Sequence, residues 1–120
     1  VVHGADGLDE ITLTNHTHVS ELRDGNVRNL TIHPEQLGFT CCTPADIKGG
    51  TPEESAAIII AALEGETGPK RDIVLLNAAA AIMVAGKSDS MQSALGLARQ
   101  SIDTGVAYQK LKALCQVSNS

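Results

Sequence analysis

The stretch "VVHGADGLDEITL", residues 1–13, joins a short apolar run to an acidic turn that contains two glycines. An apolar run that ends in such a turn is typical of a buried strand in a parallel sheet. The rest of the chain offers no obvious parallel partner for residues 1–3, and this segment is too short and too apolar to suit a sheet edge. We therefore expect the chain to be part of a larger fold, and the absence of an initiator Met fits this expectation.

The acidic turn is the first candidate site. In open α/β sheets, ligands bind beyond the carboxyl ends of the strands, and Gly4 and Gly7 would let the backbone approach a ligand closely there. The turn also carries three carboxylates, those of Asp6, Asp9 and Glu10. Hard oxygen ligands favour Mg²⁺, which keeps several waters and bridges to substrate phosphates. Acidic turns are also common on solvated surfaces, so a turn without a metal is the alternative.

Beyond this turn, the sequence up to residue 50 shows a pattern of strands and turns. Asp24-Gly25 lies between two partly alternating stretches and predicts a β-hairpin, because glycine readily takes the positive φ that such turns need. Residues 33–50 contain two prolines and three glycines. This composition predicts an irregular connector with at most a short helical turn.

After residue 50 the pattern becomes helical. Residues 51–65 have a full start signal, with Thr51 as the cap, Pro52 in the first turn and Glu54 placed to close a capping box. The segment 71–86 follows and is apolar almost all round, which predicts a buried helix with neighbours on several sides.

Two further helical segments complete the chain. Residues 88–105 begin at a predicted Ser88 cap, and one apolar face at helical spacing is formed by Met91, Ala94, Leu95, Ala98 and Ile102. Residues 106–116 form a last helix, and we expect the tail 117–120 to be frayed. The fold class is therefore α/β, with strands first (1–50) and then about four helices (51–120).

The composition of the chain argues against one class of binding partner, the nucleic acids. The chain has 120 residues, enough for about one domain, and its aromatic residues are Phe39 and Tyr108. The net charge is −5, and no basic stripe is present. Few rings for base stacking and no basic patch argue against nucleic-acid binding.

The cysteines indicate a compartment. Their number is three, at Cys41, Cys42 and Cys115, with no spaced disulfide framework, which indicates a reducing environment. We expect all three to be small packing residues. The longest apolar stretch, residues 73–86, is too short to span a membrane and carries Asn77. The predicted location is cytoplasmic, with no membrane partner.

A few other polar residues are weaker candidates. We expect His3 to be a hydrogen-bonded structural histidine, with a substrate contact as the alternative. His16 and His18 are spaced like residues on one strand face, but no third ligand supports a transition-metal site. A buried Asn77 must be hydrogen-bonded, and we expect it to tie a loop or a strand carbonyl. Gly49-Gly50 could approach a phosphate or, as we prefer, position the following helix.

Several consecutive blocks resemble the C-terminal part of the anthranilate phosphoribosyltransferase family, in order. They are "VVHGADGLDEITL", "HVSELRDGNV", "PEQLGF", "GGTPEESA", "ALEGETGPKRDIVLLNAAAAIMVAGK" and "ALGLARQSIDTGVAYQKL". The strongest are the Gly-Leu-Asp-Glu segment and "DIVLLNAAAAI". One departure is visible at Ser55, where family members commonly carry Asn, and we expect it to affect helix capping only.

The resemblance implies a reaction and a metal. The family transfers a phosphoribosyl group from phosphoribosyl pyrophosphate to anthranilate, releasing pyrophosphate, as a step of tryptophan biosynthesis. Its fold joins a small helical domain to a larger α/β domain, and its members are usually homodimers through the helical domain. Mg²⁺ escorts the diphosphate, and the Asp-Glu pair that binds it falls on Asp9 and Glu10.

The resemblance also implies what this chain lacks. The family's glycine-rich substrate loop, its anthranilate-holding residues and most of its helical domain lie upstream of the matching blocks. Residues 1–120 are thus expected to be a partial α/β domain that is inactive alone, with catalytic and substrate-binding residues elsewhere. Two alternatives remain open: a non-catalytic binding module on the same scaffold, and a relative of the pyrimidine nucleoside phosphorylases.

Overall fold

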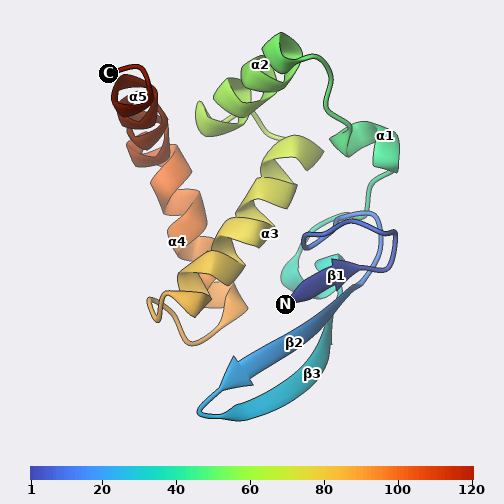
Figure 1. Cartoon of the computed structure of the whole chain (residues 1–120). Coiled ribbons are helices and arrows are strands. Elements are labelled where there is room, and N and C mark those ends of the chain that lie inside the picture. The colour runs from blue at the N-terminus through green and yellow to red at the C-terminus, as the bar shows by residue number, and fades with distance from the viewer. The chain divides into compact units, whose positions relative to one another are not determined.

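The computed structural model describes residues 1–120 and divides into two compact units, Val1–Ile47 and Lys48–Ser120. The strands belong to the first unit and the long helices to the second (Figure 1). The division falls close to residue 50, where the sequence changes from a strand pattern to a helical one. The observed fold class is α/β, as the sequence predicts.

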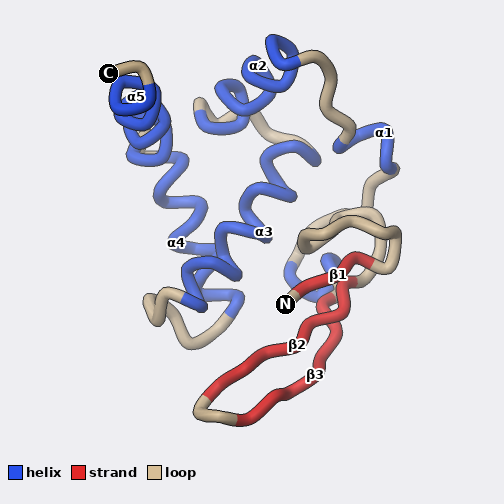
Figure 2. Tube along the Cα trace, in the orientation of Figure 1, coloured by secondary structure: helices blue, strands red, loops and turns tan.

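The sheet of the first unit has three antiparallel strands in the order β1 (Val2–Gly4), β2 (Thr17–Arg23) and β3 (Asn26–Ile32). Strands β2 and β3 form the predicted hairpin (Figure 2), with Arg23 opposite Asn26. Both turn residues have positive φ, 51° at Asp24 and 78° at Gly25. Two successive positive φ values match the twist of the flanking strands, which explains why Asp-Gly predicts this turn well.

Strand β1 differs from its prediction. It pairs antiparallel with β2, with Val2 opposite Val19 and Gly4 opposite Thr17, and it lies at the edge of this sheet. Val1 is 95% exposed. The loop of residues 5–16 returns the chain beside its own strand, and such a return makes neighbouring strands antiparallel. The antiparallel pairing with β2 was not predicted, and the expected parallel neighbours, which would lie outside residues 1–120, stay a prediction.

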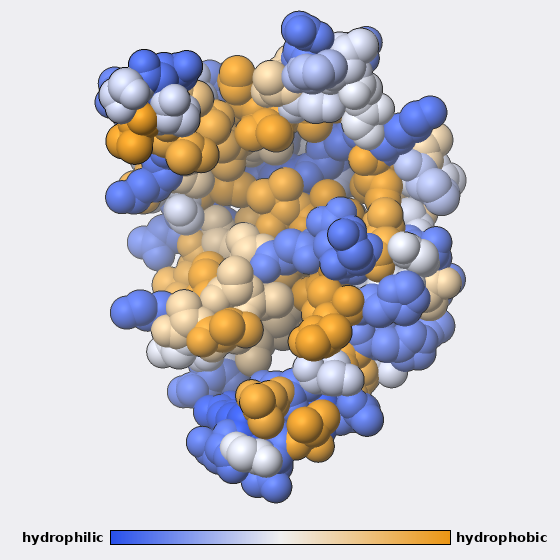
Figure 3. Space-filling model, in the orientation of Figure 1, coloured by the Kyte–Doolittle hydropathy of each residue, from blue (hydrophilic) through white to orange (hydrophobic).

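The connector after the hairpin contains two short helical turns where one at most is predicted. They are the 3₁₀ helix η1 (Pro34–Leu37) and the single-turn helix α1 (Pro44–Ile47). The buried apolar side chains of this unit come from loops and from η1, not from the hairpin: Ile11, Leu13, Pro34 and Phe39. Apolar side chains at the far end of the hairpin stand among hydrophilic ones (Figure 3), where Leu22 and Val27 form an exposed cross-strand pair.

The second unit consists of four helices, as predicted: α2 (Pro52–Leu63), α3 (Pro69–Val84), α4 (Met91–Asp103) and α5 (Val106–Ser118). The most extensive contact among them joins α3 to α4. The predicted apolar face of α4 is confirmed, because Ala94, Leu95, Ala98 and Ile102 are buried and Met91 is half-buried. Helix packing in this unit therefore follows the 3.6-residue period of its sequence.

Helix starts confirm one predicted cap and correct another. Thr51 Oγ1 accepts from Glu54 N at 3.2 Å, and Glu54 Oε2 accepts from Thr51 N at 2.7 Å, which is the full capping box of α2. Helix α4 is capped by Ser90 and not by Ser88. Ser90 is extended and its Oγ accepts from the N–H of Ser93 at 3.2 Å, whereas Ser88 Oγ donates to the carbonyl of Ser90.

Two helices are less buried or longer than their sequences predict. Leu75, Leu76 and Ala79 of α3 are buried, but Val84 is 91% exposed, so all-round burial of this helix is wrong within this chain. Helix α5 continues through Ser118 into the segment predicted to be frayed. None of the helices has the length and apolar character needed to cross a membrane.

Candidate metal-binding loop

The acidic turn is a loop closed at its base by main-chain hydrogen bonds. Gly4 N donates to Leu8 O, and Ala5 N donates to His16 O, each at 2.9 Å. Within the loop, Gly7 has a φ of 96°, a value that glycine adopts without strain. These bonds bring the end of β1 beside the start of β2, so the loop begins and ends on the sheet.

The interior of the loop is organised by Asp6. Its Oδ1 accepts from Leu8 N at 3.1 Å. Its Oδ2 accepts from the hydroxyl of Thr12 at 2.5 Å and from the hydroxyl of Thr14. This carboxylate therefore links three points of the loop. The links are strong, because hydrogen bonds to a charged acceptor are stronger than those to a neutral one.

Thr12 ties the same network to the sheet. It is fully buried, its N–H donates to Thr17 Oγ1 of β2 at 3.1 Å, and its Oγ1 accepts from Thr14 N at 3.0 Å. The network also explains Gly4, because a Cβ there would collide with Asp6 Oδ1 and lie 3.1 Å from Thr12 Cγ2. A glycine at the end of β1 is therefore required by close approach of the loop side chains.

The hydrogen bonds also set the charge of Asp6. Partial burial raises its pKa, but the bonds from Thr12, Thr14 and Leu8 together outweigh that effect and hold the pKa below its ordinary value. Asp6 is therefore ionised at neutral pH, the state in which its Oδ2 accepts from both hydroxyls.

Asp9 and Glu10 lie in the same loop, between the residues that Asp6 bonds, and all three acidic residues are exposed. The three acidic residues of the turn divide into two kinds. The Asp6 side chain accepts hydrogen bonds from other residues of the loop, whereas the side chains of Asp9 and Glu10 accept none from it. Neighbouring exposed carboxylates suit Mg²⁺, which needs one or two protein carboxylates and fills its other positions with water and phosphate oxygens.

The fit is partial, because no group of three or more His, Cys, Asp or Glu side chains is arranged to hold a metal ion. A metal at Asp9 and Glu10 would depend on oxygens from water or from a bound diphosphate. The threonines that order this loop were missed from the sequence. A signal for them exists, since Thr12, Thr14 and Thr17 lie within six residues of one another, and the first of them comes two residues after Glu10.

The histidines do not form a metal site. The ring centroids of His16 and His18 are 4.9 Å apart, and His33 lies 5.6 Å from His16. A third ring is therefore present near the predicted pair, yet the rings form no ligand group. His3 is exposed, so the structure does not give it the expected hydrogen-bonded role within residues 1–120.

Asn77 is hydrogen-bonded, as predicted, but this bond goes to a carbonyl of its own helix and not to the loop or strand carbonyl that we expect from the sequence. Its Nδ2 donates to the carbonyl of Ile73, one turn earlier in α3, at 3.0 Å. This bond satisfies one donor of a half-buried side chain.

The cysteines are less buried than predicted. Cys41 and Cys115 are exposed, and Cys42 is half-buried. The Cys41 thiol donates to Glu35 Oε1 at 2.9 Å, and this bond to a carboxylate raises the pKa of the thiol to about 11. Cys41 is therefore a poor nucleophile at neutral pH.

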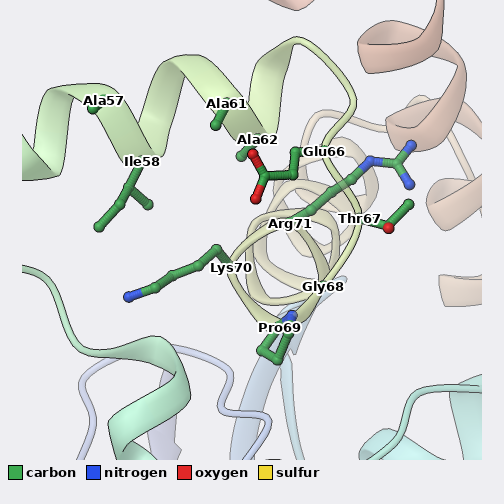
Figure 4. Close-up of a pocket in the computed structure, with 10 residues that line it drawn as sticks. All are labelled: Ala57, Ile58, Ala61, Ala62, Glu66, Thr67, Gly68, Pro69, Lys70 and Arg71. Atoms are coloured by element: carbon green, nitrogen blue, oxygen red, sulfur yellow. The ribbon is translucent and has the colours of Figure 1, made fainter.

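A separate cavity of about 370 Å³ lies within the helical unit, between α2 and the start of α3 (Figure 4). Its apolar wall is formed by Ala57, Ile58, Ala61 and Ala62, and residues 66–71 complete the lining. The guanidinium of Arg71 turns away toward Asp103, with Nη2 2.5 Å from Oδ1. Glu66 and Lys70 also line the cavity, and the Lys70 ammonium donates to the carbonyl of Lys48, so the cavity combines an apolar wall from α2 with charged side chains at the start of α3.

Known proteins show the same family resemblance. Residues 1–108 match the model of the "Glycosyl transferase family, a/b domain". The anthranilate phosphoribosyltransferase of Clostridium beijerinckii is 50% identical over 114 residues, covering 95% of this chain and 34% of that protein. That of Acetivibrio thermocellus is 47% identical over all 120 residues, which cover 35% of its length.

Solved structures of the same enzyme share the fold. The anthranilate phosphoribosyltransferase of Thermus thermophilus superposes with a TM-score of 0.83 and 38% identity, covering 94% of this chain and 33% of that one. The Saccharomyces cerevisiae enzyme, in complex with phosphoribosyl pyrophosphate and Mg, gives a TM-score of 0.82 at 23% identity, over 92% of this chain and 32% of that one. This chain thus spans about a third of the length of the relatives it matches.

Proposed function

Because the chain belongs to the glycosyl transferase family through its a/b domain, we propose that the complete protein transfers a phosphoribosyl group from phosphoribosyl pyrophosphate to anthranilate. Pyrophosphate is the other product, and the reaction is a step of tryptophan biosynthesis. The observation that carries this proposal is the 50% identity to an anthranilate phosphoribosyltransferase across 95% of the chain. The Gly-Leu-Asp-Glu segment lies within that match and its two carboxylates are exposed.

In this reaction, Asp9 and Glu10 are the proposed Mg²⁺ ligands. Bound Mg²⁺ supplies charge neutralisation for the departing diphosphate. The two carboxylates would hold the ion at the exposed side of the loop, where a diphosphate can supply further oxygens. The main-chain hydrogen bonds at the base of the loop limit the motion of both residues, which keeps their two carboxylates close to the position of the ion.

The chain's contribution to the whole protein is correspondingly limited. We propose that residues 1–120 are part of one α/β domain, with the metal loop in the first unit and helices in the second. The phosphoribosyl pyrophosphate loop, the anthranilate-binding residues and a helical domain that forms a homodimer would belong to other parts of the protein. The expected location is the cytoplasm, where the free cysteines would remain reduced.

The test is an assay of anthranilate consumption by fluorescence, using the longest natural form of the protein and phosphoribosyl pyrophosphate with Mg²⁺. The double variant Asp9→Asn with Glu10→Gln should lose at least about 100-fold in kcat/KM, since even outer-shell metal partners are worth 10- to 100-fold. A matched control, Glu53→Gln with Glu64→Gln, neutralises two exposed acids of the helical unit and should leave the rate unchanged.

Other results would contradict the proposal in different ways. Full activity of the double variant would remove the metal role of Asp9 and Glu10. Phosphorolysis of pyrimidine nucleosides without anthranilate consumption would identify a nucleoside phosphorylase, and neither reaction would indicate a non-catalytic module. Appreciable turnover by residues 1–120 alone would show that the substrate-binding residues are not elsewhere.

A further inference from the structure

Asp6 has a role that differs from that of its acidic neighbours. Its two oxygens accept three hydrogen bonds, from the N–H of Leu8 and from the hydroxyls of Thr12 and Thr14. Leu8 immediately precedes the Asp9-Glu10 pair, and Thr12 follows it by two residues. The carboxylate therefore joins the two sides of the segment that carries the proposed metal ligands.

We propose that Asp6 is the positioning residue of this loop, which holds Asp9 and Glu10 in the geometry that receives Mg²⁺ with a diphosphate. This inference rests on the proposed function. Its physical basis is that the bonds of Asp6 hold the backbone on both sides of Asp9 and Glu10. The two ligands therefore give up less conformational freedom when a metal binds, which makes binding tighter.

Two features tie this network to the rigid part of the unit. Thr12 is fully buried and bonded through its N–H to Thr17 of β2, so one hydroxyl partner of Asp6 is fixed to the sheet. Gly4 at the end of β1 leaves the space that the Asp6 carboxylate and the Thr12 side chain occupy. The ionised state favoured by these bonds keeps Asp6 an acceptor only, which suits three donors.

The decisive experiment compares Asp6→Ala, Thr14→Val and Thr14→Ser in the longest natural form of the protein. Asp6→Ala and Thr14→Val should raise the Mg²⁺ concentration for half-maximal activity about 10-fold, as loss of an outer-shell partner does. The kcat at saturating Mg²⁺ should fall much less, because excess metal refills the site. Thr14→Ser keeps the hydroxyl and should restore the wild-type requirement.

A second measurement does not depend on activity. Deuterium uptake of peptides covering residues 5–14, without metal, should be faster in Asp6→Ala and Thr14→Val but not in Thr14→Ser. Peptides from α4 serve as the internal reference. Added Mg²⁺ with inorganic pyrophosphate should slow uptake at residues 8–10 in the wild type, and Asp6→Ala should need more Mg²⁺ for the same protection.

The outcomes separate this inference from the proposed function. If Asp6→Ala lowers kcat or stability but leaves the Mg²⁺ requirement unchanged, Asp6 is merely structural and the inference is overturned. Unchanged uptake at residues 5–14 in Asp6→Ala overturns it as well. If the wild type consumes no anthranilate, the proposed function fails, and protection by Mg²⁺ with pyrophosphate still decides the role of Asp6.

Discussion

The acidic loop and the helix pair α3–α4 are ordered by different forces. In the loop, a carboxylate and threonine hydroxyls make directional hydrogen bonds, and much of the chain around them is exposed. In the helix pair, leucines and alanines such as Leu76 and Ala98 are buried and make no polar contact. The contrast shows that apolar burial supplies stability, whereas the loop's bonds fix where particular side chains point.

The largest expected effect lies in the helix pair. Leu76→Ala should lower the free energy of unfolding by about 2–5 kcal/mol, because it leaves a cavity at a fully buried site. Val84→Ala, at a 91% exposed position of the same helix, should change it by less than about 0.5 kcal/mol. Urea unfolding measures both, and equal losses would mean that burial does not govern this region.

The next effect concerns close approach in the loop. Gly4→Ala should destabilise the protein by about 1–3 kcal/mol, as overpacking does, because the new methyl group collides with Asp6. Gly96→Ala is the matched control, since its Cβ meets no atom within 4 Å and lies in a helix. That change should stabilise by roughly 0.5–1 kcal/mol. Thermal unfolding midpoints that move in the same direction would contradict the account of Gly4.

A smaller effect depends on pH. The pKa of Asp6 is lowered in the folded state from an ordinary value of 3.8, so its stabilisation is present above that pH and disappears as the pH falls through the folded-state pKa. Asp6→Asn should therefore be less stable than wild type by about 1 kcal/mol at neutral pH. The difference should vanish in acid. The effect of Gly96→Ala, which changes no titrating group, should stay constant over the same range.

The smallest effect is chemical and leaves stability unchanged. Cys41 should react slowly with iodoacetamide at pH 8, because Glu35 raises the pKa of its thiol to about 11. Glu35→Gln removes the negative charge and should accelerate alkylation of Cys41 by up to about 10-fold per pKa unit recovered. Alkylation of the exposed Cys115 provides the reference within the same molecule and should not change. Mass spectrometry of the two peptides follows both rates.

Sequence reasoning succeeds where the determinants are local. The Asp24-Gly25 hairpin and the Thr51 capping box each depend on residues within a few positions, and both are confirmed. The Ser90 cap could not be separated from Ser88, because serine at either position provides the same acceptor. The antiparallel pairing of β1 with β2 was not predicted, because it depends on the path of the loop that connects the two strands.

The sequence predicted which acidic residues make up the candidate site, but not how their side chains are hydrogen-bonded. The sequence places Asp6, Asp9 and Glu10 in one turn, but it cannot tell which carboxylate is used inside the loop. That distinction needs the position of Thr12 and Thr14 in space. The exposure of Cys41 was likewise missed, since it depends on how the connector folds beside Glu35.

The short span of the loop's contacts bears on the order of folding. Asp6 bonds to Thr14 across eight residues, and Ala5 bonds to His16 across eleven. Closing such short segments loses little chain entropy and takes much less time than assembling distant strands. The acidic loop and its hairpin can therefore fold during synthesis, before the residues of the four helices have been added to the chain.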